Sequence, residues 1–193
     1  MEEKLKANKS WDTRDISALK SLGRKRGGER KIYLYLAHWL VKKWPEGKVW
    51  VDPSSLGIDI VQQIGEKYIG FEVKIPLVKQ TKSGERFLDP SPICDGIGQA
   101  LGYFQRGMDL AYLVHPEISY QYKIDVSVLV RETSIGLILF DKHANFTLVT
   151  EAVSPSKKRL YTEEWRKIMK EVLEMQEPFS TSTNMIHISE TLV

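Results

Sequence analysis

The chain has 193 residues, of which 42% are hydrophobic and 27% charged, and its formal net charge at pH 7 is +3. This length and composition fit one globular domain with a sizeable core and exclude a low-complexity chain. The small basic excess permits a polyanionic partner without requiring one.

The first part of the chain predicts two helices. Residues 1–28 are polar and basic, and a short helix is expected over residues 15–22, ending at Gly23. From Glu29 onward, apolar residues recur at helical spacing until Pro45 ends the helix. The inward face comprises Ile32, Tyr33, Leu36, Trp39, Leu40 and Val41. Because Glu29 lies three and four residues before Ile32 and Tyr33, it stands at the start of that face.

The middle of the chain predicts strands and a crossover helix. Strand-like runs occupy residues 48–52, 58–62 and 68–75. Residues 76–94 contain three prolines and predict a long loop or a protruding hairpin. Asp95 is expected to cap a helix that runs to about Arg106.

The last part of the chain predicts three more strands, at residues 110–115, 135–140 and 146–151. Thr162 is expected to cap a final helix with the apolar stripe Trp165, Ile168, Met169, Val172 and Leu173. The Ser/Thr-rich residues 178–193 are expected to form a mobile tail. The order of helix, three strands, helix and strand predicts an α/β/α sandwich around a mixed central sheet, in one domain.

Two of the predicted strands carry charges on one face. Side chains on a strand alternate between its two sides, so Glu72 and Lys74 share the side opposite Phe71 and Val73. If the two strands pair as a hairpin, Asp59 comes near Glu72. Two adjacent carboxylates repel unless a proton or a divalent cation compensates them, and such hard oxygen ligands suit Mg²⁺ or Mn²⁺. The alternative is a solvated face, which is the commoner explanation for such a triplet on its own.

Residues elsewhere in the sequence favour a site. Gln99 and Tyr103 are four residues apart and project from one side of the predicted crossover helix, with Asp95 one turn earlier. Together with Glu29, they would surround the charged ends of the strands.

This pattern resembles the PD-(D/E)xK nuclease superfamily, which has the restriction-endonuclease-like αβββαβ core. Asp59 matches the motif aspartate, and residues 72–74 match the (D/E)xK tripeptide. Glu29 matches the glutamate of the first core helix, and residues 99–103 resemble the QxxxY motif of RecB-like nucleases. Ile58 replaces the motif proline. The resemblance covers about residues 24–115, and the stretch GRKRGGER is also similar to archaeal Holliday junction resolvases.

The resemblance implies a Mg²⁺-dependent (or Mn²⁺-dependent) nuclease that leaves a 5′-phosphate. Asp59, Glu72 and the Val73 carbonyl would bind the metal, and Glu29 would hold a second metal or a metal-bound water. Lys74 would position the attacking water, while Gln99 and Tyr103 would orient Lys74 or contact the DNA backbone. No Walker A sequence is present, so no nucleotide cofactor is expected.

Two clusters of basic residues flank the predicted site. Phosphate contacts supply most non-specific affinity for DNA. The candidate DNA-binding residues are Arg24, Lys25, Arg26, Arg30, Lys79, Lys82 and Arg86. Each of them, taken alone, also has the ordinary explanation of a solvated surface charge.

The sequence also bears on compartment and assembly. The single cysteine, Cys94, excludes an internal disulfide framework and suits a reducing compartment. No signal-peptide-like or membrane-spanning apolar run is present, so a cytoplasmic protein without a membrane partner is expected. Cutting two strands takes two active sites, which predicts a homodimer through the last helix or through strand edges after His115.

Two alternatives to a nuclease remain open. One is an inactive DNA-binding or assembly protein that keeps the fold. The other is a metal-free protein-interaction domain that docks through the final helix, whose stripe is otherwise explained by core packing.

Overall fold

The computed structural model describes residues 11–21, 28–53, 55–118, 126–155 and 162–181. Its centre is a six-stranded sheet with the strand order β1-β2-β3-β6-β7-β8. Antiparallel pairing joins the first three strands, β3 and β6 and then β6 and β7 pair in parallel, and β8 is antiparallel to β7. The strands are β1 Lys48–Val51, β2 Ile60–Ile64, β3 Lys67–Val73, β6 Leu110–Pro116, β7 Gly136–Phe140 and β8 Phe146–Thr150. The predicted mixed sheet is therefore confirmed.

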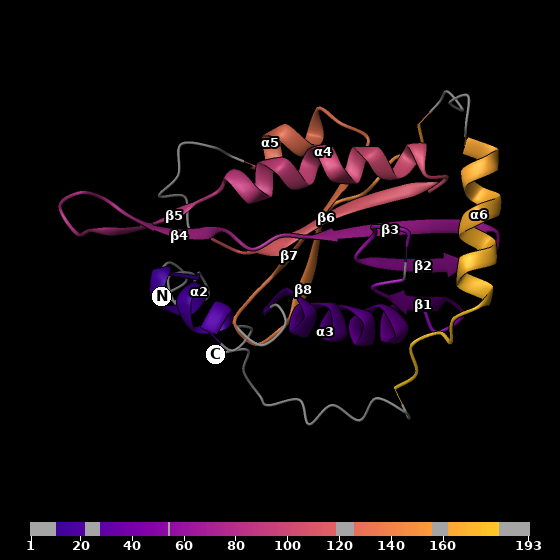
Figure 1. Ribbon diagram of the computed structural model, residues 1–193, viewed down its shortest axis with the longest axis horizontal. Coiled ribbons are helices and arrows are strands. Elements are labelled where there is room, and N and C mark those ends of the chain that lie inside the picture. The colour runs from indigo at the N-terminus through magenta and orange to yellow at the C-terminus, as the bar shows by residue number, and fades with distance from the viewer. Residues whose placement is uncertain (1–10, 22–27, 54, 119–125, 156–161, 182–193) are drawn as a thin grey trace.

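Helices cover both faces of the sheet (Figure 1). One face packs on α3 (Gly28–Lys43), with α2 (Thr13–Ser21) beside it. The other face packs on α4 (Ser91–Gln105), with α5 (Val126–Arg131) nearby. The predicted α/β/α sandwich and its order of helix, three strands, helix and strand are confirmed.

Alternation along β3 divides the core into two clusters. Phe71, Val73 and Ile75 pack into the cluster on the α3 side. Leu113, on the neighbouring strand, packs with Tyr103 into the cluster on the α4 side. Glu72 points to that second side, because successive side chains on a strand face opposite ways. The charged face of β3 therefore lies beneath α4, as the sequence pattern predicts.

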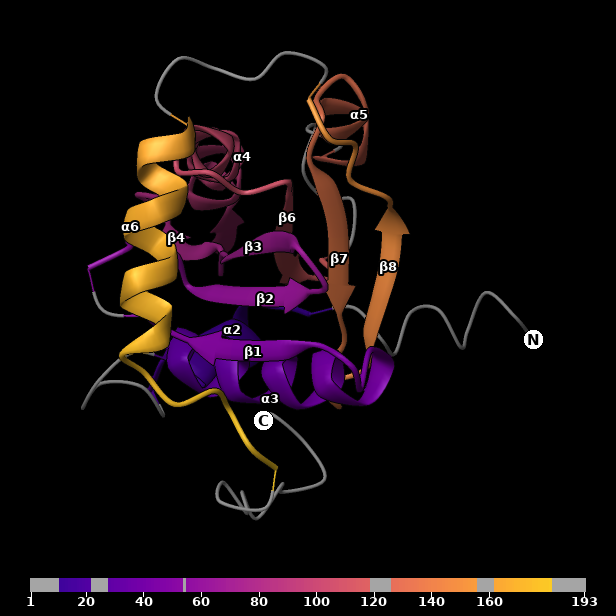
Figure 2. The same cartoon turned by 90° about the vertical axis from the view of Figure 1, so that its right-hand side faces the viewer.

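The final helix, α6 (Thr162–Glu174), lies across one end of the sheet (Figure 2). Its residues Met169 and Leu173 are buried in the α4-side cluster, so the core-packing explanation holds for them. Trp165 and Ile168 remain 42% and 45% exposed. A homodimer through this exposed part of the stripe stays a prediction.

The segment after β3 forms the protruding hairpin that was one of the two expectations for it. Its strands are β4 (Leu77–Gln80) and β5 (Arg86–Asp89), which form a separate two-stranded sheet. The hairpin extends away from the body of the molecule at the end opposite α6 (Figure 1).

The predicted start of the crossover helix at Asp95 is wrong, because α4 begins at Ser91. Pro90 and Pro92 suit a helix start, where a missing N–H costs nothing. The N-cap residue is Pro90, which makes no side-chain capping bond, and the preceding Asp89 carboxylate accepts hydrogen bonds from the Ser91 backbone N–H at 3.0 Å and from its hydroxyl.

Two features near the chain's flanks were not predicted. Trp11 is buried in the α3-side cluster, and its indole N–H donates a hydrogen bond to the Phe140 carbonyl at 3.1 Å. The short helix α5 was also missed.

Among the described residues, no helix combines the length and apolar character needed to span a membrane. Residues 182–193 of the expected tail lie outside the described ranges.

Candidate functional site

The candidate site lies where the antiparallel pairing of β2 and β3 ends. Ile60 pairs with Phe71 in the register of these strands. One step further, Asp59 reaches the level of Glu72. The prediction that Asp59 belongs to a strand is wrong, because β2 begins only at Ile60. Gly57, with φ +59°, turns the chain before Asp59, and the Asp59 carbonyl accepts a hydrogen bond from the Asp52 N–H at 2.7 Å.

The Asp59 carboxylate is held by two donors from different elements. The Val73 backbone N–H donates to its Oδ2 at 2.8 Å, and the Tyr33 hydroxyl of α3 donates a second hydrogen bond. Burial, and after it the negative charge of Glu72, nevertheless raise the pKa of Asp59 to about 6. The two carboxylates are therefore close enough to repel each other.

Glu72 is 4% exposed, and both its oxygens have partners. Lys74 Nζ lies 2.5 Å from Oε1, and the Tyr103 hydroxyl donates to Oε2. Burial and the charges of Glu72 and Asp59 raise the pKa of Tyr103 well above its ordinary value. Tyr103 therefore keeps its proton and acts as a hydrogen-bond donor to Glu72 at any physiological pH.

Two glycines make room for these contacts. A Cβ added at Gly70 on β3 would lie 2.7 Å from Cδ2 of Tyr103. A Cβ added at Gly96 on α4 would lie 2.6 Å from Cγ of Lys74. Both distances are shorter than real Cβ contacts allow, so a larger residue at either position would push a site residue aside. The sequence interpretation did not single out either glycine, although a glycine inside a strand or a helix often marks such a close approach.

Arg106, which follows α4, ties the Asp59 loop to the helix. Its Nη1 donates to the Leu56 carbonyl at 3.0 Å and to the Gly57 carbonyl at 2.5 Å, and its guanidinium carbon lies 5.8 Å from the Tyr103 ring centroid. Tyr33 and Arg106 were both missed as site residues. Tyr33 had a usable signal, since it stands four residues after Glu29 on the predicted inward face.

Two other predicted site residues are not placed in contact with this cluster. Gln99 is exposed, and within the described parts of the chain no hydrogen bond links it to Glu72 or Lys74. Glu29 belongs to the first turn of α3, but its side chain lies outside what the structure describes. The roles of both residues remain predictions.

The predicted DNA-binding residues have different surroundings. Arg24, Lys25 and Arg26 lie outside the described residues, and Arg30 is exposed on α3. Lys79, Lys82 and Arg86 are exposed on the hairpin. Lys79 forms an ion pair with Asp89, so part of its charge is neutralised within the hairpin.

The donor set fits a small divalent cation. Asp59 and Glu72 offer hard carboxylate oxygens, and their mutual repulsion gives them a reason to bind positive charge. Within the described residues, no group of three or more His, Cys, Asp and Glu side chains gathers at one point. A site here would therefore rest on two carboxylates, a backbone carbonyl and water, which suits Mg²⁺ because it retains several waters.

A comparison with protein-family profiles found no match, and neither did a comparison with curated protein sequences. Two solved structures are similar over 63% of this chain. One is an FdxN element excision controlling factor protein from Anabaena variabilis, at 19% identity and a TM-score of 0.40, covering 100% of that chain. The other is an XisH family protein from Nostoc punctiforme PCC 73102, at 17% identity and a TM-score of 0.38, covering 98% of that chain. These TM-scores are too low to establish a common activity.

Proposed function

We propose that this chain is a Mg²⁺-dependent DNA nuclease of the PD-(D/E)xK type, acting as a structure-selective endonuclease or an exonuclease. The observation that carries the proposal is the convergence of Asp59, Glu72 and Lys74 at the end of β3, with Tyr103 closing over Glu72 from α4. These residues come from separate parts of the chain and include two carboxylates in repulsive proximity. A solvated charged face would not bury Glu72 to 4% exposure.

Asp59, Glu72 and the Val73 carbonyl would hold the metal ion. Bound Mg²⁺ supplies Lewis-acid chemistry, which stabilises negative charge on a phosphate group and makes water more acidic. The Val73 N–H and the Tyr33 hydroxyl keep the Asp59 carboxylate oriented.

Lys74 would donate hydrogen bonds to a water molecule or to a phosphate oxygen of the substrate. Its side chain is 18% exposed, and Glu72 fixes the direction of its ammonium group. Tyr103 holds Glu72 from the other side as a hydrogen-bond donor, because burial and the neighbouring carboxylates raise its pKa. The pair Lys74 and Tyr103 thus determines where the Glu72 carboxylate lies.

A cleavage panel tests the proposal. Linear duplex, single strand, flap and four-way junction DNA are each incubated with the protein, with and without Mg²⁺ or Mn²⁺. We expect metal-dependent cleavage of at least one substrate, lost in Lys74→Ala while the circular dichroism spectrum and the DNA affinity stay close to wild type. If no substrate is cut in Mn²⁺, or if Lys74→Ala cuts at the wild-type rate, the proposal fails.

A further inference from the structure

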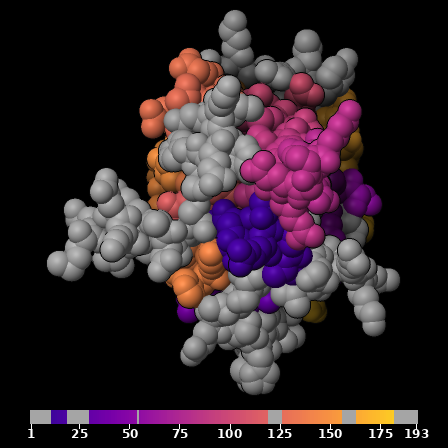
Figure 3. Space-filling model, turned by 90° about the vertical axis from the view of Figure 1, so that its left-hand side faces the viewer, coloured from indigo at the N-terminus to yellow at the C-terminus, as the bar shows by residue number. Residues whose placement is uncertain are grey.

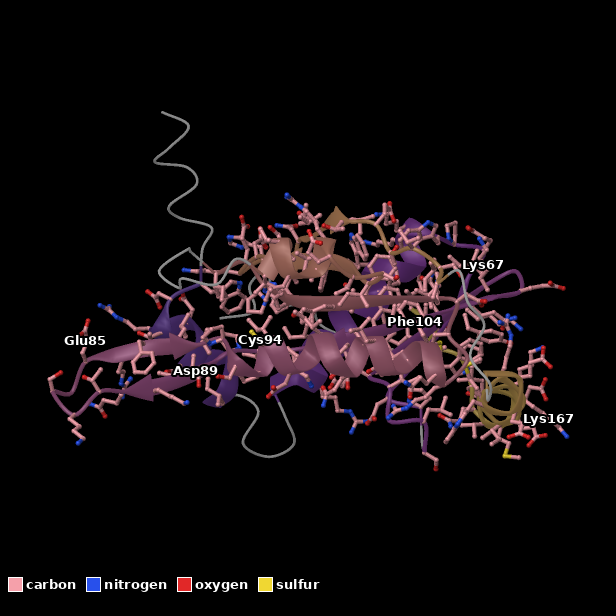
Figure 4. The ribbon with its side chains drawn as sticks, turned by 90° about the horizontal axis from the view of Figure 1, so that it is seen from above. Lys67, Glu85, Asp89, Cys94, Phe104 and Lys167 are labelled. Atoms are coloured by element: carbon pink, nitrogen blue, oxygen red, sulfur yellow. The ribbon has the colours of Figure 1, made fainter. Side chains whose placement is uncertain are left out.

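The β4–β5 hairpin is built into the candidate site at both of its ends. The chain enters the hairpin at Leu77, three residues after Lys74, and leaves it from Asp89 into α4, which carries Gly96 against Lys74. Figure 4 shows Glu85 at the tip, and Asp89 at the base beside Cys94 of α4. A strand advances about 3.3 Å per residue, so the arm reaches roughly 15–20 Å beyond the site.

The hairpin has one inward and one outward face. Leu88 is 3% exposed and packs, with Val78, into the same cluster as Val73 and Ile75 on the α3 side. Figure 3, which looks onto the end where the hairpin protrudes, shows its magenta residues beside the indigo residues of α2. The opposite face is therefore turned to the side of the sheet that carries Glu72 and α4.

That outward face presents apolar and basic side chains together. Lys79 pairs directly with Phe87 across the hairpin. Phe87 is 39% exposed and Leu77 is 42% exposed, and neither side chain belongs to the two core clusters. An exposed aromatic ring beside cations is the combination with which proteins stack unpaired nucleic-acid bases.

The arm is held firmly along its length. At its base, Asp89 pairs with Lys79 and accepts two hydrogen bonds from Ser91, which together lower the pKa of Asp89 to about 2. At its tip, the Gln80 amide donates to the Gly84 carbonyl at 2.8 Å, and the Glu85 N–H donates to the Thr81 hydroxyl at 3.1 Å. Phe87 thus lies between two ends of the hairpin that are fixed by side-chain contacts.

The free positive charge lies on the outer half of the arm. Lys82, in the turn, and Arg86 are exposed, and neither forms an ion pair with any of the described residues. Arg86 pairs with Gln80 on the same face as Leu88, so of these two cations only Lys82 can lie beside Phe87. A phosphate contact is the natural use of such a cation next to a stacking surface.

We propose that the hairpin is a substrate-binding arm on which Phe87 stacks an unpaired base while Lys82 in the turn contacts the backbone. This inference rests on the proposed nuclease function and narrows its substrate class to DNA that contains unpaired nucleotides, such as a flap or a gap. In a blunt duplex the internal bases stack on one another, so none of them is free to stack on Phe87.

The test measures binding rather than cleavage, in EDTA, by the fluorescence anisotropy of a labelled flap and of a blunt duplex of equal length. Phe87→Ala should weaken binding to the flap about tenfold, equivalent to about 1.4 kcal/mol, and change binding to the duplex less than twofold. Phe87→Trp should restore flap binding. The matched control is Trp165→Ala, an exposed aromatic on α6 at the other end of the molecule, which should change neither affinity.

The proposal that the hairpin binds unpaired DNA would be refuted if Phe87→Ala bound the flap as tightly as wild type, or if it lost affinity equally for the flap and the duplex. It would also be refuted if Phe87→Ala changed the mass measured by light scattering, because Phe87 would then be a contact between copies of the chain. A wild-type protein that binds flaps through Phe87 but cuts nothing in Mn²⁺ would leave the arm intact and refute the nuclease. A protein that cuts DNA regardless of residue 87 would do the reverse.

Discussion

Replacing Asp59 with asparagine should stabilise the metal-free protein at neutral pH. Burial and the charge of Glu72 raise the pKa of Asp59 from 3.8 to about 6. A shift of about two pH units corresponds to about 3 kcal/mol in unfolding free energy, as an upper bound. Asparagine carries no charge, yet its side-chain oxygen can still accept hydrogen bonds from the Val73 N–H and the Tyr33 hydroxyl.

The sign of the pH dependence follows from proton binding. Between about pH 4 and pH 6 the folded chain, whose Asp59 has the higher pKa, binds more protons than the unfolded chain does. The stability contributed by protonated Asp59 is therefore present below pH 4 and is lost as the pH rises through 6. Asp59→Asn should exceed the wild type by about 1–3 kcal/mol at pH 7.5, and the two should converge near pH 4.

Urea unfolding in EDTA, followed by tryptophan fluorescence, measures the difference, and the same experiment is then repeated with Mg²⁺. Wild type should gain about 1.4 kcal/mol when Mg²⁺ is at ten times its dissociation constant, whereas Asp59→Asn should gain nothing. Asp89→Asn is the control of opposite sign, because the pKa of Asp89 is lowered to about 2 and its loss should destabilise the fold at pH 7.5. An Asp59→Asn variant that is no more stable than wild type at pH 7.5, or that keeps the wild-type response to Mg²⁺, would refute the role assigned to Asp59.

Three further predictions concern residues around the site. Gly96→Ala should lose most cleavage, because its methyl group would meet both Lys74 and the buried Leu113, whereas Gly98→Ala, with nothing within 4 Å of the added Cβ, should keep full activity; a Gly96→Ala enzyme with wild-type kcat would contradict this. Arg106→Ala should raise the Mg²⁺ concentration needed for half-maximal thermal stabilisation, since the carbonyls of the Asp59 loop lose their clamp, and an unchanged midpoint in a melting titration would exclude that role. In His115→Gln, the unfolding free energy should fall less steeply as the pH is lowered. Burial lowers the pKa of His115 to about 4, so the stability that it contributes is present above pH 6.5 and is lost as the pH falls through 4, by up to about 3 kcal/mol. A wild-type acid profile in the His115→Gln variant, measured by urea unfolding, would contradict this assignment.

The face of β3 could be predicted because a strand pattern with a period of two is a local signal. Ile69, Phe71 and Val73 alternate with Glu72, and this alone determines which side chains pack on α3 and which lie beneath α4. The pairing that brings Asp59 to Glu72 was also predictable from a local signal, because a short turn joins the two strands.

The contacts that complete the site could not be predicted in this way, because they join distant parts of the chain. Arg106 reaches back 50 residues to Leu56, and the Tyr103 hydroxyl reaches back 31 residues to Glu72. The start of α4 was misjudged for a related reason. Asp95 has the residue type of a cap, but the hairpin ends at Asp89 and α4 begins directly after it, with Pro90 as its N-cap.

Several local choices at the site oppose stability, and they meet at one place. Glycine is unfavourable inside a strand or a helix, yet Gly70 and Gly96 occupy such positions and leave room for Tyr103 and Lys74. A buried carboxylate is costly, yet Glu72 is buried beside Asp59, whose pKa is raised by burial and then by the charge of Glu72. Buried Gln62 on β2 and His115 on β6 are further polar exceptions in the sheet, but exceptions concentrated around one residue are typical of a site selected for chemistry. In the metal-free chain, the ion pair with Lys74 and the hydrogen bond from Tyr103 offset the cost of burying the Glu72 carboxylate. The residues proposed for catalysis therefore also stabilise this end of β3.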